Sequence, residues 1–312
     1  MRNLLFVPAL IAFAAPLSAE TLTVMSFNIY GGGANDEKPI DETVAAILAA
    51  GADIVGLQET RLEGEICDAD YCPAGGPSVA AAIAEALGFY YYDQTTENVA
   101  LWANAVISRY PIGAATENDL GVPIDVNGTV VWLFNIHHDD EPYQPYQALG
   151  IEYGPAPFVN TAPELIDWAN RTRGPAMDLL FADMAAAEGA IAIVTGDFNE
   201  PSMYDWTAST VAAGLQPVEV EWPTTKRLVD AGFEDAYRVI WPDPVAKPAF
   251  TWTPIWTTED DPEDHHDRID FVFVRGAQVS AASIVGEPGP RTDIVVDPWP
   301  SDHRAVVATI DF

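Results

Sequence analysis

Basic residues are scarce in this chain. Only 14 lysines and arginines stand against 47 aspartates and glutamates, which gives a formal net charge of −33 in 312 residues. Affinity for nucleic acids comes largely from basic side chains that displace counterions along the phosphates. The composition therefore makes a nucleic acid a less favoured partner, without excluding one, because bound metal ions can invert the local field.

Long apolar runs are also lacking, except for residues 4–17, which follow Arg2 and precede Ser18 and Ala19. A positive charge, an apolar segment and small residues at a cleavage site are typical of a secretory signal peptide. An uncleaved anchor helix is the alternative, but this run is shorter than the roughly 20 residues needed to span a bilayer. We expect a signal peptide over residues 1–19, no transmembrane anchor, and a secreted or periplasmic protein.

Cysteine is nearly absent, since the chain has two, Cys67 and Cys72. In an oxidising compartment such a close pair most simply forms a local disulfide that pins a loop. A metal or redox role is less favoured, because the spacing is not CxxC and no second pair exists. Linkers rich in Ser, Gly or Pro and internal repeats are lacking too, so residues 20–312 are predicted to form one domain.

Hydrophobic patterning predicts more strands than helices. Some neighbouring strands are close enough in sequence to pair antiparallel, and such a set favours two packed sheets covered by helices, an α+β fold. The expected helices are 39–50, 78–87 and a segment within 163–187, and the expected strands are 21–29, 53–58, 89–92, 99–108, 129–136, 191–195, 250–253, 269–274 and 305–310.

The sequence Thr-Gly-Asp-Phe-Asn follows the apolar run 191–194 and carries Asp197 and Asn199. Side chains two apart on extended backbone share a face, so this carboxylate and amide would project together from a strand end. One could accept a proton or bind a metal, and the other could hydrogen-bond a phosphoryl oxygen. An ordinary Asp/Asn-rich turn is the alternative.

Further polar residues lie at the ends of other apolar segments. Asp302 and His303 precede the last strand and suit acid/base work, unless they form a capped turn. Asp270 enters a very apolar strand and needs a partner, for which His137 and Arg268 are candidates. At two earlier strand ends, Asn28 and Glu59 supply the oxygen ligands that Mg²⁺ or Ca²⁺ prefers.

Taken together, these motifs resemble those of the endonuclease/exonuclease/phosphatase (DNase I-like) superfamily. The chain resembles a secreted, bacterial-type member of it. Seven motifs match in the family's order over nearly the whole mature chain: SFNI, LQET, AVISRYPI, NIH, GDFN, RIDFVFV and SDH. The resemblance implies a four-layer α/β/β/α sandwich of two mixed sheets and a phosphoesterase that uses Mg²⁺, Mn²⁺ or Ca²⁺.

The resemblance also implies roles for individual residues. Asn28, Glu59 and Asp302 would help bind the metal, Glu59 directly, and the pair of Asp302 and His303 would complete the active site. His137 would contact the phosphate or leaving group, and Asp270 would support His137 by a hydrogen bond. Asp197 would position or deprotonate the attacking water, with His303 as the other candidate base, and Asn199 would bind a phosphoryl oxygen.

Two features depart from the family pattern. An acidic cluster with His265 and His266, spanning 260–267, could bind a further ion or form a solvated loop. Arg171 and Arg173 stand out because basic residues are scarce, and they could contact the substrate phosphate or make surface ion pairs.

Three functions compete. The first is hydrolysis of a small-molecule or lipid-linked phosphoester by in-line attack of water, with the metal offsetting charge. The second is an extracellular DNase I-like endonuclease, which the acidic charge disfavours. The third is a catalytically inactive binding module, which the intact motif positions disfavour. The motifs leave the oligomeric state open, and the fold class does not choose the substrate.

Overall fold

The computed structural model describes residues 20–64, 74–255 and 264–312. The expected signal peptide and the Cys67–Cys72 pair lie outside the described residues. In the part described, no helix is long and apolar enough to cross a membrane.

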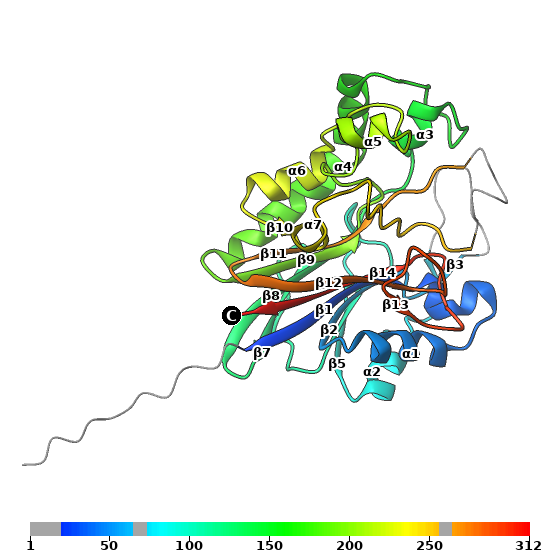
Figure 1. The fold of residues 1–312 in the computed structure, drawn as a ribbon. Coiled ribbons are helices and arrows are strands. Elements are labelled where there is room, and N and C mark those ends of the chain that lie inside the picture. Colours follow the sequence, from blue (N-terminus) through cyan, green and yellow to red (C-terminus); the bar gives the residue numbers. More distant parts are fainter. Residues whose placement is uncertain (1–19, 65–73, 256–263) are drawn as a thin grey trace, which may run out of the picture.

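Two mixed β-sheets form the centre of the fold (Figure 1). The seven-stranded sheet has the order β13-β12-β14-β1-β2-β6-β5, and the five-stranded sheet has the order β10-β11-β9-β8-β7. Their strands are β1 Thr21–Asn28, β2 Ile54–Gln58, β5 Tyr90–Asp93, β6 Ala105–Ser108, β7 Gly121–Val126, β8 Thr129–His137, β9 Ile191–Asp197, β10 Glu234–Asp235, β11 Asp270–Arg275, β12 Gln278–Gly286, β13 Ile294–Val295 and β14 Ala305–Asp311. A separate hairpin pairs β3 Leu62–Glu63 with β4 Ala74–Gly75.

Helices cover the outer faces of both sheets. The helical elements are η1 Tyr30–Asp36, α1 Ile40–Ala50, α2 Ala80–Leu87, α3 Gln144–Leu149, α4 Ala162–Met184, η2 Ala185–Ala187, α5 Ala208–Ala212, α6 Pro223–Asp230 and α7 Ala236–Ile240. Residues of α1 and α2 pack on the seven-stranded sheet, and residues of α4 and α6 pack on the five-stranded sheet. The predicted four layers, helix, sheet, sheet and helix, are thereby confirmed.

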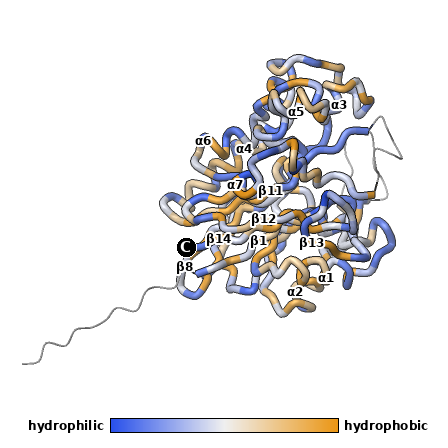
Figure 2. The backbone as a smooth tube through the Cα atoms, in the orientation of Figure 1, coloured by the Kyte–Doolittle hydropathy of each residue, from blue (hydrophilic) through white to orange (hydrophobic). Residues whose placement is uncertain are grey.

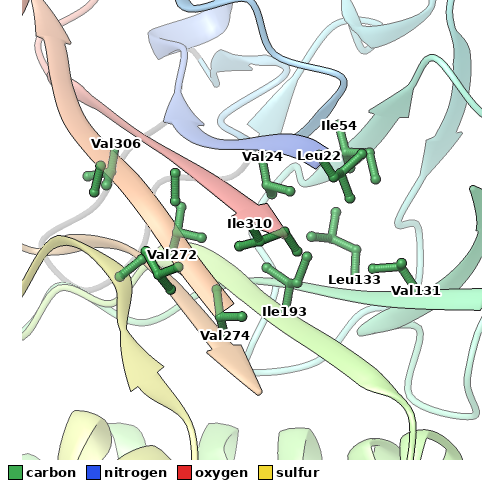
Figure 3. Close-up of a cluster of buried hydrophobic side chains, with 14 of the residues drawn as sticks. Leu22, Val24, Ile54, Val131, Leu133, Ile193, Val272, Val274, Val306 and Ile310 are labelled. Atoms are coloured by element: carbon green, nitrogen blue, oxygen red, sulfur yellow. The ribbon is translucent and has the colours of Figure 1, made fainter. Parts of the chain in front are cut away.

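The largest hydrophobic cluster lies between the two sheets. Leu22, Val24 and Ile54 come from one sheet, and Leu133 and Ile193 come from the other (Figure 3). Hydrophobic stretches, orange in Figure 2, follow the strands, while hydrophilic stretches occupy many connecting loops. Each fully buried aliphatic side chain contributes about 1.5–3 kcal/mol, so this interface is a main source of stability.

Close approach of the sheets requires a glycine on β2. A Cβ at Gly56 would lie 2.0 Å from the Thr195 hydroxyl and 2.5 Å from Oδ1 of Asn135. Asn135 is fully buried, and its amide donates to the backbone oxygens of Leu57 and Ala105. Asn135, which lies on β8, therefore joins the two sheets.

Some expected elements differ from the structure. Of the strand expected over 99–108, only β6 forms, because Asn98 and Asn104 accept hydrogen bonds from backbone N–H groups of the preceding loop. The segment 250–253 makes only isolated bridges through Trp252 instead of a strand. β7 and β12 were not predicted. β7 contains Pro123, which an edge strand tolerates.

Candidate functional site

The predicted polar residues converge because neighbouring strands end together. His137 ends β8 directly opposite Asp197 at the end of β9, and Asp270 begins β11 opposite the same Asp197. Asn28 ends β1, and Glu59 follows β2 in the other sheet. The register of the two sheets thus gathers these side chains at one edge of the sandwich.

Asp197 lies at the centre of the contacts. Its Oδ2 is 3.6 Å from Nε2 of His137 and 3.6 Å from Nε2 of His303. The amide of Asn28 donates to the same oxygen at 3.1 Å, across the junction of the two sheets. The backbone N–H of Asn199 donates to Oδ1 at 2.9 Å. These contacts hold the carboxylate in one orientation, facing both imidazoles.

Asp270 orients His303. The ring Nδ1–H of His303 donates to Oδ2 of Asp270 at 2.9 Å, and both side chains are buried. The prediction that His137 or Arg268 partners Asp270 is therefore wrong, because the chain before β14 brings His303 closer than either. It is Asp270, rather than the adjacent Asp302, that makes the buried hydrogen bond to the His303 ring.

His137 and Asn199 are held by backbone groups of the loops beside them. Nδ1–H of His137 donates to the carbonyl of Trp102 at 3.4 Å, which leaves Nε2 facing Asp197. Asn199 donates from its side chain to the carbonyl of His138 at 2.9 Å. The Trp102 ring also packs edge-on against His137, with centroids 6.1 Å apart. Trp102 was missed because nothing in its local sequence marks it as a site residue.

Two site residues adopt the left-handed backbone conformation that favours glycine. Glu59 has a φ of 54° and Asn199 a φ of 46°. This conformation costs roughly 1–2 kcal/mol in a non-glycine residue. Backbone strain of this kind clusters where geometry serves a function.

The residues fit a divalent metal ion. Glu59, Asp197 and His303 each offer one ligand atom, and these atoms lie within 4.8 Å of one another. The Asn28 amide donates to Oε1 of Glu59 at 2.7 Å, while Oε2 is buried with no hydrogen-bond partner among the described residues. A buried carboxylate oxygen without a partner is a ready ligand for a hard cation such as Mg²⁺ or Ca²⁺.

Electrostatics support the same conclusion. Burial and the neighbouring Asp302 carboxylate raise the pKa of Glu59 to about 8. Burial also raises the pKa of Asp302 to about 6. For His303, burial alone would lower the pKa, but the carboxylates of Asp270, Asp197 and Asp302 outweigh it and raise the pKa well above its ordinary value. The protein concentrates negative charge here, and a bound cation would compensate it.

The two arginines do not join this cluster. Arg171 is exposed on α4, pairs with Asp167 one turn away and lies over the Trp168 ring. Arg173 is fully buried, and its guanidinium donates to Gln144 and to backbone carbonyls. The prediction that Arg173 contacts the substrate phosphate is therefore wrong, because a side chain with no exposed surface cannot reach a bound phosphate.

The described part of the acidic cluster is a structural junction. Asp267 is buried and accepts hydrogen bonds from the Tyr143 hydroxyl and the Trp206 indole, both at 2.9 Å. Nε2 of His265 lies 2.8 Å from the side-chain oxygen of Gln216. Within the described ranges, the only potential metal group of His, Cys, Asp and Glu is that of Glu59, Asp197 and His303.

Comparisons with known proteins identify the family of the chain. The model of the Endonuclease/Exonuclease/phosphatase family matches residues 25–303. An uncharacterized protein from Caenorhabditis elegans is 28% identical over 313 residues, which cover 93% of this chain and 91% of that protein.

Solved structures show the same fold at low identity. An endonuclease/exonuclease/phosphatase from Beutenbergia cavernae has a TM-score of 0.55 at 18% identity, covering 94% of this chain and 72% of that one. The 3′ phosphatase NExo from Neisseria, bound to a product DNA hairpin, has a TM-score of 0.54 at 16% identity, covering 93% of this chain and 100% of that one. An AP endonuclease from Archaeoglobus fulgidus has a TM-score of 0.51 at 15% identity, with coverage of 93% and 100%.

Proposed function

The chain belongs to the endonuclease/exonuclease/phosphatase family, and from this premise we propose that it is a secreted or periplasmic, divalent-metal-dependent enzyme that hydrolyses a small-molecule or lipid-linked phosphoester. One observation supports the chemistry above all others. Side chains from both sheets converge so that Glu59, Asp197 and His303 offer ligand atoms within 4.8 Å of one another. Hydrolysis proceeds by in-line attack of water.

Glu59 would hold the metal, with Asn28 and Asp302 beside it. When bound, the ion would offset negative charge on the phosphoryl oxygens and the leaving group. Its identity is proposed as Mg²⁺, with Mn²⁺ or Ca²⁺ as substitutes, because the donor set consists mainly of hard oxygens.

The remaining side chains act on the water and the phosphate. Asp197, fixed by Asn28 and by the Asn199 N–H, positions the attacking water and accepts its proton. His303, oriented by Asp270, donates a hydrogen bond to a phosphoryl oxygen. His137 faces the same space from β8 and binds the phosphate or the leaving group. Hydrogen-bond donors aimed at developing charge are a major source of rate enhancement.

Charge supports a small or lipid-linked substrate. A net charge of −33 repels a polyanion over its whole length, whereas a small ester presents one phosphate to the site. Arg171 remains an exposed basic side chain that a substrate phosphate could meet.

A nuclease is the second candidate. It is favoured by one observation, that a protein of the same fold from Archaeoglobus fulgidus is described as an AP endonuclease. An inactive binding module is disfavoured because Glu59, Asp197 and His303 offer ligand atoms within 4.8 Å of one another.

Parallel assays of one purified sample test the proposal. The enzyme is freed of metal with a chelator and then assayed, with and without Mg²⁺, Mn²⁺ or Ca²⁺, on an activated phosphodiester, a phosphomonoester, sphingomyelin and double-stranded DNA. We expect metal-dependent hydrolysis, greatest on one of the small or lipid esters. Full activity in verified metal-free enzyme, or activity on none of the four, overturns the proposal.

A further inference from the structure

Arg173 lies behind the catalytic side chains and contacts the turn that follows His137. It projects from α4 and has an exposed fraction of 0%. One Nη donates to the side-chain oxygen of Gln144, and the other donates to the carbonyls of Asp140 and Pro142, each at 3.4 Å. A single rigid guanidinium therefore holds three points of the chain that leaves β8.

Glu200 is the buried charged residue of a second turn, the one that contains Asp197 and Asn199 at the end of β9. It directly follows Asn199 and is also 0% exposed. One carboxylate oxygen accepts from the N–H and the hydroxyl of Thr224, at 2.8 and 2.7 Å. The other carboxylate oxygen and Nε of Arg173 have no hydrogen-bond partner among the described residues. Arg173 and Glu200 make no direct ion pair. Burial raises the pKa of Glu200, and the positive charge of Arg173 opposes that rise.

The two turns held in this way carry catalytic groups. The first begins at His137, and the second contains Asp197 and Asn199. They already meet through the Asn199 amide, which donates to the carbonyl of His138 at 2.9 Å. The ring of His138 packs against Phe198 with centroids 5.2 Å apart. A shift of either turn would therefore move His137 relative to Asp197.

Stability alone is a weak explanation for such a pair. Replacing buried charges of opposite sign by apolar groups of similar volume is often neutral or stabilising. Unpaired buried polar atoms also cost free energy, about 1–3 kcal/mol each. Direct substrate contact is excluded by the burial of Arg173.

We propose that Arg173 and Glu200 are positioning residues: Arg173 anchors the His137 turn, and Glu200 anchors the Asp197–Asn199 turn. The inference rests on the proposed phosphoesterase function. It concerns the turns of the five-stranded sheet, which contribute Asp197 to the candidate metal group, whereas Asn28 and Glu59 belong to the other sheet. Disturbing these two residues should therefore lower turnover much more than it lowers metal affinity.

The test uses the full chain and a panel of variants. Arg173→Met and Glu200→Gln each leave one buried charge uncompensated, whereas the double variant removes both. Arg173→Lys keeps the charge but loses the planar fork that reaches several acceptors. Arg227→Met is the matched control, because Arg227 makes a more exposed ion pair with Asp178 of the same α4 helix. Measurements are the melting temperature, kcat, KM and the half-saturating Mg²⁺ concentration.

We expect kcat to fall at least about tenfold in both single variants, in Arg173→Lys and in the double variant, with a Mg²⁺ midpoint within about twofold of the wild type. The double variant should recover melting temperature relative to the single variants but not kcat. If the single variants do not fold, kcat and the Mg²⁺ midpoint of the double variant and of Arg173→Lys test the inference. A folded double variant with wild-type kcat overturns the inference, as does a loss of kcat matched by an equal shift of the Mg²⁺ midpoint. An inactive wild type instead overturns the proposed function.

Discussion

Nδ1 of His303 lies 2.9 Å from Oδ2 of Asp270, although 33 residues separate them in sequence. The contact forms because β11 and the segment before β14 meet at the same edge of the sandwich. It fixes the imidazole so that Nε2 faces Asp197, 3.6 Å away. The orientation of one candidate catalytic histidine thus depends on a carboxylate buried behind it.

Asp270→Asn should lower kcat by about a hundredfold with the protein still folded, because an amide no longer fixes the tautomer and charge of His303. Steady-state kinetics on an activated phosphodiester, with circular dichroism as a check of folding, measures the effect. Asp178→Asn is the control, since that side chain is 74% exposed. Equal losses in both variants would show that Asp270 has no special role.

Glu59→Gln should raise the half-saturating metal concentration by at least about tenfold, because it removes the buried anionic ligand. Metal titration of activity and isothermal titration calorimetry provide independent readouts. Glu63→Gln, a change in a nearby exposed residue, should leave both unchanged. A wild-type midpoint in Glu59→Gln would remove Glu59 from the metal site.

Asp197→Asn and His303→Ala should each lower turnover by at least about a hundredfold, because each removes a proton-handling or charge-stabilising group. The rates are compared at saturating metal, after thermal melting has shown that the variants are folded. Near-normal turnover in both would mean that the family's motif roles do not transfer to this chain.

Substrate choice should follow charge. We expect kcat/KM for the best small or lipid phosphoester to exceed that for double-stranded DNA at least about tenfold at low salt, a difference of roughly 1.4 kcal/mol. The metal concentration is held constant, because divalent ions also screen DNA. A higher kcat/KM for DNA under these conditions would establish the nuclease alternative.

Stability in acid should depend on Asp235. Burial alone would raise its pKa, but the buried Arg268 guanidinium, 2.7 Å from Oδ2, lowers the pKa below the ordinary value of 3.8. The folded protein thus binds this proton more weakly than the unfolded chain does. The resulting stabilisation is complete above about pH 5 and is lost as the pH falls below 3.8 toward the lower folded-state pKa.

Asp235→Asn should consequently lower the free energy of unfolding at pH 7 by about 3 kcal/mol and flatten its decline in acid. Urea denaturation at several pH values between 3 and 7 measures both effects. Asp178→Asn should leave the curve unchanged. If the free energy of unfolding of Asp235→Asn declines in acid as steeply as that of the wild type, other carboxylates cause the acid sensitivity.

The sequence by itself determined the fold class and named the candidate site residues. Apolar segments mark β1, β8 and β9, and each of these strands ends in a polar residue, which an apolar core alone would not favour. Asn28, Glu59, His137, Asp197 and His303 could therefore be named in advance. β12 was missed because its small and polar residues carry little strand signal, and it forms by pairing with β14.

Only the tertiary structure decided which polar group meets which. Sequence spacing places Asp302 beside His303, yet the partner of the ring is Asp270, because adjacent residues on extended backbone point apart while paired strands bring distant residues together. The tertiary structure also decided which of the two arginines of α4 is buried. Arg171 faces solvent, and Arg173, two residues later, faces the interior, a difference set by packing of the helix against the catalytic turns.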